Sequence, residues 1–212
     1  MRGIRNGTLA AVVLAGSICF AAPEPAIVPA AGQWTVNAMF THPQQIVLRA
    51  GPQEKAERFW YTILTITNKT GEDIEFYPRC DLMTDTFHIL PASKGVSPTV
   101  FELIKQRHQR KYPFLENLEQ AGNRILQGED NTKDLAIIWP DFDAQAKGVK
   151  VFIAGLSNET AMVTHPVAKD ENGQAVKVFL RKTLELNYTV KGDPALRSDL
   201  DLSYVDKRWV MR

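Results

Sequence analysis

Two aspartates separated by one residue carry the clearest metal-binding pattern in the chain. Asp141 and Asp143 follow Trp139-Pro140, and carboxylates gathered in one loop suit Ca²⁺, which prefers several oxygen ligands. His165 lies three residues after Met162, and copper accepts an imidazole beside a thioether. Neither pattern has the spacing of a complete motif, and turn or core roles explain the same residues. The sequence therefore indicates a metal site as an alternative, with Asp141, Asp143 and His165 as candidate ligands.

The densest group of charged side chains is basic and lies between residues 105 and 111. Its members are Lys105, Arg107, Arg110 and Lys111. Such a cluster can bind anions, for example acidic polysaccharide, phosphate or lipid headgroups. The same residues at the end of a helix interact favourably with its last carbonyl groups, which is the simpler interpretation. We take these four residues as the candidate partner-binding surface.

Familiar catalytic motifs are absent from the sequence. It contains no Gly-x-Ser-x-Gly elbow, His-Glu-x-x-His pair, Cys-x-x-Cys pair or glycine-rich phosphate loop. No pattern indicates a cofactor, so none is expected. The sequence favours a protein that binds without catalysing a reaction, and a hydrolase assembled from distant residues is a less favoured alternative.

The overall composition excludes other classes of protein. There are 25 Lys+Arg against 24 Asp+Glu, which gives a net charge of +1. Proteins that bind nucleic acid generally carry a strong basic excess, so no nucleic acid partner is expected. Hydrophobic residues make up 44% of the chain, which is too many for a disordered protein.

The N-terminal residues predict export. Arg2 and Arg5 precede an apolar run from Leu9 to Ala22 that ends in small residues, the pattern of a secretory signal peptide. The run is shorter than the roughly 20 apolar residues of a membrane-spanning helix. We therefore expect a signal peptide over residues 1–21, no stable membrane span in the mature chain, and a periplasmic, cell-envelope or secreted location.

Cysteine is scarce in the predicted mature chain. Cys19 lies inside the signal peptide, where the residue before it is too large for a typical lipidation site. Cys80 then remains alone, and we expect it to be buried as a small hydrophobe, with pairing to another chain as the alternative. Glycosylation sequons at Asn68, Asn158 and Asn187 matter only if the source adds N-glycans.

The elements that must position these residues are strands. Residues 22–32 are rich in Pro and Ala and read as a linker, and residues 33–212 form the expected domain. Runs of β-branched and aromatic residues recur between turn residues, which predicts an antiparallel, all-β architecture. The expected strands cover residues 34–40, 45–50, 58–68, 74–76, 80–90, 135–139, 149–156, 180–190 and 200–211.

The strand at 180–190 shows the clearest alternation. Its even-numbered residues are apolar except for Lys182, so this face is expected to be buried. The opposite face is expected to be wet and carries Arg181, Thr183, Glu185, Asn187 and Thr189.

A helical insertion is expected at about residues 97–128. Ser97-Pro98 suits a helix start, and an apolar stripe runs from there to Pro113. A second stripe continues to Gly128, a residue suited to the position after a helix, so two helices are predicted. A sandwich does not need them to close its core, and we expect them to contact a partner.

Part of the chain resembles a known class of domain. Trp60 to Pro78, with its aromatic strand, Thr70-Gly71 turn and returning strand, resembles the early strands of immunoglobulin-like domains in exported bacterial proteins. The Trp139-Pro140-Asp141-Phe142 stretch and the ending at residues 206–212 look similar to uncharacterised proteins of that kind. The Cys–Trp–Cys core of antibody-type domains is absent. The resemblance implies a fold and a compartment and transfers no catalytic residues.

These patterns together predict a mainly β protein, an immunoglobulin-like antiparallel β-sandwich with a short two-helix insertion. The leading functional hypothesis is an exported, non-enzymatic binding or structural module of the cell envelope or secretome, with an envelope protein or polysaccharide as its partner. The alternative is a periplasmic protein that binds a metal or a small ligand.

Overall fold

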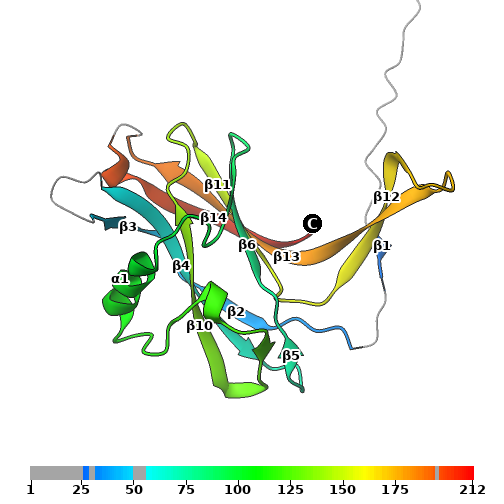
Figure 1. The fold of residues 1–212 in the computed structure, drawn as a ribbon, viewed down its shortest axis with the longest axis horizontal. Helices are drawn as coiled ribbons and strands as arrows, with labels where there is room; N and C mark the ends of the chain where they lie inside the picture. The colour runs from blue at the N-terminus through cyan, green and yellow to red at the C-terminus, as the bar shows by residue number, and fades with distance from the viewer. Residues whose placement is uncertain (1–25, 29–31, 50–55, 194–195) are drawn as a thin grey trace, which may run out of the picture.

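The computed structural model describes residues 26–28, 32–49, 56–193 and 196–212. The predicted signal peptide at 1–21 and most of the predicted linker lie outside the described residues. Within them the protein is mainly β, and its sheets are almost entirely antiparallel, as expected (Figure 1).

A five-stranded sheet is built around the long strand β4. β2 and β3 pair with successive parts of one edge of β4, and β10 pairs with the other edge. The short β8 runs parallel to β10 and is the exception to antiparallel pairing. The five strands are β2 (Asn37–Phe40), β3 (Gln44–Leu48), β4 (Glu57–Asn68), β8 (Glu116–Asn117) and β10 (Gly128–Pro140).

A seven-stranded sheet is ordered β1-β12-β13-β11-β6-β7, with β14 paired to β13. Its strands are β1 (Ala26–Ile27), β6 (Arg79–Thr84), β7 (Ile89–Pro91), β11 (Gly148–Ala154), β12 (Thr160–Lys169), β13 (Ala175–Lys191) and β14 (Asp201–Met211). A separate small pair joins β5 (Ile74–Glu75) to β9 (Arg124–Ile125). β1 falls within the stretch that the sequence predicts to be a linker.

The main core cluster takes side chains from both larger sheets. Trp60 on β4 and Trp139 on β10 lie in one cluster with Leu82 on β6, Val151 on β11 and Leu186 on β13, and all five are at most 1% exposed. Burial of this much apolar and aromatic surface is the main force that stabilises the arrangement. Cys80 also lies in this cluster as a buried free thiol, so its predicted burial is confirmed.

A helix covers the opposite face of the five-stranded sheet. α1 (Pro98–His108) begins at Ser97, whose side chain accepts a hydrogen bond from the Thr99 amide, as the sequence predicts. Its buried residues pack on alternate residues of β4 and β10 and form a second core cluster. The second cluster includes Val100, Phe101, Ile104, Tyr61, Ile63, Ala136 and Ile138.

The second predicted helix is wrong. Residues 114–127 contain β8, a single 3₁₀ turn (Leu118–Gln120) and β9, and Gly128 begins β10 instead of ending a helix. The Asn117 side chain accepts from the Glu119 amide and starts the short turn, a local bond that competes with a longer helix. Phe114, placed on the apolar stripe by its spacing, is 83% exposed. Pairing with β5 and β10 therefore overrides the helical spacing.

The hairpin of β12 and β13 extends away from the rest of the sheet (Figure 1). The first half of β13 pairs with β12, and its second half pairs with β11 and β14. Residues Gly155 to Glu159 separate β11 from β12 along the same edge of β13. The chain bends at this break. The bend lies beside the outer face of the seven-stranded sheet, which is the face turned away from the main core cluster.

Candidate functional site

The outer face of the seven-stranded sheet buries two carboxylates. Strand register aligns Asp81, Phe152, Glu185 and Arg208 side by side across β6, β11, β13 and β14. Asp81 is 4% exposed and Glu185 is 3% exposed, and Thr183 is also buried. The face of β13 that was expected to be exposed to solvent is therefore buried at Thr183 and Glu185. Lys150 on β11 and Arg208 on β14 form ion pairs with Glu185 on this face.

Glu185 is compensated by cations from both neighbouring strands. Its Oε1 lies 2.7 Å from Nη2 of Arg208 and 3.4 Å from Nζ of Lys150. Burial opposes its ionisation, but the hydrogen bonds from Arg208 and Asn187 and the charges of Lys150 and Arg208 outweigh burial and lower the pKa of Glu185. This carboxylate therefore holds three strands together and offers nothing to a ligand.

Asp81 is partnered on one oxygen only. Its Oδ2 lies 3.3 Å from Nε of Arg79 and 3.7 Å from Nη1 of Arg212. Its Oδ1 is buried and has no hydrogen-bond partner in the described part of the chain. Leaving a buried acceptor unpaired costs stability, and this oxygen has no surface that a ligand could contact.

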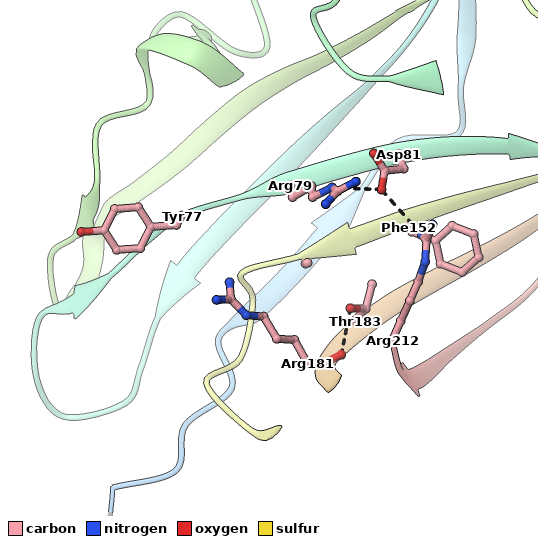
Figure 2. A pocket seen from close by; sticks show the side chains of 8 residues that line it. Tyr77, Arg79, Asp81, Phe152, Arg181, Thr183 and Arg212 are labelled. Carbon is pink, nitrogen blue, oxygen red and sulfur yellow. Dashed lines mark hydrogen bonds and ion pairs between the residues drawn. The ribbon is translucent and has the colours of Figure 1, made fainter. Parts of the chain in front are cut away.

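A depression of about 380 Å³ opens beside Asp81. Its lining carries three guanidinium groups and one carboxylate, so it is electropositive. Arg212 lies over the Phe152 ring, 4.0 Å from the ring centroid, and is held there by its ion pair with Asp81. The lining residues are Tyr77, Arg79, Asp81, Phe152, Ala154, Arg181, Thr183 and Arg212 (Figure 2).

Arg181 is the cation that this depression leaves available. Its guanidinium is exposed, lies apart from the ion pairs of Asp81 and has no ion-pair partner among the residues that the structure describes (Figure 2). Its backbone is fixed by hydrogen bonds between Arg181 and Arg212 in both directions and by the Thr183 hydroxyl, which donates to the Arg181 carbonyl. An anion can therefore bind Arg181 without displacing an existing partner.

A second depression, of about 270 Å³, continues from the first. The two share Tyr77 and Arg181, and the second also includes Trp34, Gly155 and Glu159. We call the two together the arginine groove. Gly155 shapes it, because a Cβ there would lie 2.9 Å from the Tyr77 carbonyl oxygen and the residue has a φ of +92°. The exposed residue Tyr77 lines both halves of the groove.

The predicted basic surface lies at the end of α1, where two of its residues hold other groups. Arg107 donates to the Gln45 carbonyl at 3.1 Å and contacts the Tyr61 hydroxyl at 3.3 Å, which ties the helix to β3 and β4. Lys105 lies over the Phe101 ring. These contacts favour the structural interpretation for part of the cluster.

The remaining cations of this cluster are more open to solvent. Arg110 and Lys111 are exposed, and Lys111 lies over the Tyr112 ring. The intervening His108 bonds to the Tyr61 hydroxyl at 2.9 Å, and burial together with the charges of Arg107 and Lys111 lowers the pKa of His108. Arg110 and Lys111 are the part of the cluster still open to a partner.

Asp141 is already engaged by protein groups. It accepts from Trp60 Nε1 at 2.9 Å and from Arg197 Nε at 3.1 Å, and Arg58 lies 3.8 Å away. Asp143 accepts from the Gln145 amide at 2.9 Å, an ordinary turn contact. Both aspartates lie in the loop after β10, and both are already bonded to other groups of the protein.

His165, the third candidate metal ligand, lies on β12 in the extended hairpin. Its Nδ1 accepts from the backbone amides of Val167 at 3.2 Å and Ala168 at 2.8 Å. Over the described ranges, no three His, Cys, Asp or Glu side chains are grouped so that they could hold a metal ion. The structure does not gather Asp141, Asp143 and His165 into one site, and the metal hypothesis stays a prediction.

Comparisons with known proteins leave the site to be judged on its geometry. No protein-family model, no curated protein and no solved structure matches this chain. Among the described residues, no helix has the length and apolar character needed to span a membrane.

Sequence reasoning missed the arginine groove. Arg79 lies on β6, Arg181 on β13 and Arg212 directly after β14, and no local spacing in the sequence connects them. The one available signal was the alternation of β13, which places Arg181 on the outer face. Strand order and register, which bring the three together, are not visible in the sequence.

Proposed function

We propose that this chain is an exported, non-enzymatic binding module of the cell envelope, and that the arginine groove is its ligand-binding surface. One observation carries the proposal: the guanidinium of Arg181 is exposed, lines both depressions and has no ion-pair partner in the described part of the chain. An unpaired, exposed guanidinium of this kind suits recognition of an anion.

We further propose that the two larger sheets form an immunoglobulin-like sandwich. Such sandwiches place strands A, B, E and D in one sheet and C, F and G in the other. Taking β2–β3, β4, β6, β8, β10, β11 and β13 as A to G reproduces both orders, which supports the proposal. The shared main core cluster supports it as well. The parallel pairing of β8 with β10 departs from that pattern.

Export is a proposal that rests on the sequence. The charged start and short apolar run at residues 1–21 support a signal peptide. In the envelope, a groove of this charge would meet anionic polymers, so an acidic polysaccharide fits it better than a neutral one.

The test measures binding of the mature chain to immobilised anionic and neutral polymers. Polygalacturonate, dextran sulfate and uncharged dextran serve as defined probes. We expect binding to at least one anionic polymer, weakened by salt, and a loss of about tenfold or more in affinity on Arg181→Gln, since a charge-assisted contact of this kind is worth about one such factor.

Arg110→Gln is the matched control, because Arg110 is an exposed arginine in the turn after α1, at the other candidate surface. It should bind like the wild type. If Arg110→Gln loses binding and Arg181→Gln does not, the ligand binds at the helix and the groove proposal is wrong. Absence of binding to every anionic polymer would refute the proposed function as a whole.

A further inference from the structure

The turn that follows α1 combines free cations with an exposed aromatic side chain. Residues 103–115 contain four lysines and arginines and neither aspartate nor glutamate. Arg110 and Lys111 are exposed, and within the described ranges neither forms an ion pair. Phe114 is 83% exposed. We call residues 109–114 the helix tip.

Backbone hydrogen bonds and one buried side chain hold the helix tip in place. The amides of Lys111 and Tyr112 both donate to the His108 carbonyl at 2.9 Å, which continues the helical winding past α1. The Leu115 amide donates to the Tyr112 carbonyl at 3.2 Å and closes a turn that contains Phe114. Leu115 is 1% exposed and belongs to the second core cluster. Because Leu115 anchors this turn in the core, the exposed Phe114 is presented to solvent at a fixed place.

The cations and the aromatic ring belong to one small patch. Phe114 follows Lys111 by three residues and Arg110 by four, so the backbone separates them by at most about 14 Å. The first acidic residue after the tip is Glu116, whose Oε2 lies 3.3 Å from Nζ of Lys133 and is compensated there. α1 and the turn after it lie on the outside of the five-stranded sheet (Figure 1). The tip is therefore a positively charged surface with an apolar ring in it.

A lipid bilayer with anionic headgroups matches this combination. Lysine and arginine are attracted to such a surface, and an apolar ring gains free energy by entering the boundary between headgroups and acyl chains. A soluble polyanion would use the cations and leave the ring in water. Phe87 offers a comparison within the chain, because it is 81% exposed but residues 80–93 around it contain no lysine or arginine.

We propose that the helix tip docks on anionic lipid bilayers, with Arg110 and Lys111 at the lipid phosphates and Phe114 inserted beneath them. The inference goes beyond the proposed function, because it assigns a second surface that works whether or not the arginine groove binds a polymer. An acidic protein is the competing partner, since it could pair with the cations without taking up the ring.

The test is co-sedimentation of the predicted mature chain, residues 22–212, with lipid vesicles. The signal peptide is left out because its own apolar run would bind lipid. The probes are vesicles of phosphatidylcholine alone and vesicles of equal parts phosphatidylcholine and phosphatidylglycerol. We expect binding to the anionic vesicles only, and we expect salt to weaken it.

Two variants and two matched controls test the helix tip. Lys111→Gln should weaken vesicle binding about fivefold, since one cation at an anionic surface is worth about this factor. Phe114→Ala should weaken it about tenfold by removing the inserted ring. Lys177→Gln and Phe87→Ala remove an exposed cation and an exposed ring elsewhere, and both should bind like the wild type.

Phe114→Trp separates insertion from attraction by charge alone. Lipids with brominated acyl chains should quench the added fluorescence at residue 114, whereas Phe87→Trp should add fluorescence that stays unquenched. Absence of binding to anionic vesicles, or binding that Phe114→Ala leaves unchanged, overturns the inference. Soluble polyglutamate that binds the tip while the vesicles do not would identify an acidic protein as the partner and would also overturn it. Neither result bears on polymer binding at the arginine groove.

Discussion

At the scale of single residues, Asp81 and Glu185 show how equal burial can serve different ends. Both flank Phe152 on the same face of the sheet, and both are nearly inaccessible to solvent. Glu185 has cations and an amide around it, whereas Asp81 keeps a buried oxygen without a partner in the described chain. Buried polar atoms are normally hydrogen-bonded, so the unpaired oxygen of Asp81 carries a cost in stability, although Arg79 and Arg212 pair with the other oxygen.

Glu185→Gln should lower the free energy of unfolding at neutral pH. It should also make that free energy fall less as the pH is lowered. The folded pKa of Glu185 lies below 4.5, so its contribution is fully present above pH 4.5 and is lost as the pH falls through the lowered folded value. Because Arg208 and Lys150 are partly exposed, we expect a loss of only about 1–2 kcal/mol at pH 7.

Urea unfolding at pH 7 and at pH 3 measures this effect. The difference in stability between wild type and Glu185→Gln should shrink at the lower pH. Glu171→Gln, an exposed residue in the hairpin turn, should change little at either pH. An equal loss for Glu185→Gln at both pH values would contradict an ionic role for this side chain.

At the scale of elements, the strands were largely predictable and the second helix was not. Asn68, Gly71 and the alternation of β13 mark their elements correctly, because turn chemistry and a period of two are local signals. Lys182, the exception on the apolar face, is explained by a partner 23 residues away: its Nζ lies 2.5 Å from Oε1 of Glu159. Residues 114–127 failed because tertiary strand pairing overrides a helical stripe.

The break between β11 and β12 depends on Gly155. A strand was predicted over 149–156, but Gly155 adopts a positive φ and lies against the backbone of Tyr77 and Pro78. Gly155→Ala should therefore cost about 3 kcal/mol, of which about 1–2 kcal/mol comes from the left-handed backbone alone. Thermal or urea unfolding measures the loss.

Gly173→Ala is the matched control for the close approach. Gly173 also has a positive φ, of +77°, but nothing lies within 4 Å of its Cβ position. Gly173→Ala should lose only the part of the stability that the left-handed backbone accounts for. If the two variants lose equal stability, the contact with Tyr77 and Pro78 is not what requires glycine at 155.

At the scale of the whole molecule, the segment 97–128 belongs to the core. It was expected to be dispensable for closing the fold, yet Val100, Ile104, Leu115 and Ile125 are at most 1% exposed. The first three cover the outer face of the five-stranded sheet, and Ile125 joins the main core cluster. The expectation fails because sequence patterns show that a helix is amphipathic and do not show which face of which sheet it covers. Removing this segment would expose β4 and β10.

The two core clusters share β4 and β10, whose alternate residues point to opposite sides. Trp60 and Leu64 face the main core cluster, and Tyr61 and Ile63 face α1. Loss of packing under the helix should therefore weaken the whole protein in one transition. Ile104→Ala should cost about 2–4 kcal/mol.

This last expectation is checked by two probes of one urea titration. Tryptophan fluorescence reports the main core through the buried Trp60 and Trp139, and far-ultraviolet circular dichroism reports all secondary structure. Ile104→Ala should move both transitions to the same lower midpoint, whereas Phe114→Ala, at a residue that is 83% exposed, should move neither. A fluorescence transition left in place while the dichroism shifts would mean that α1 unfolds on its own. The helix would then be a layer that folds separately from the main core.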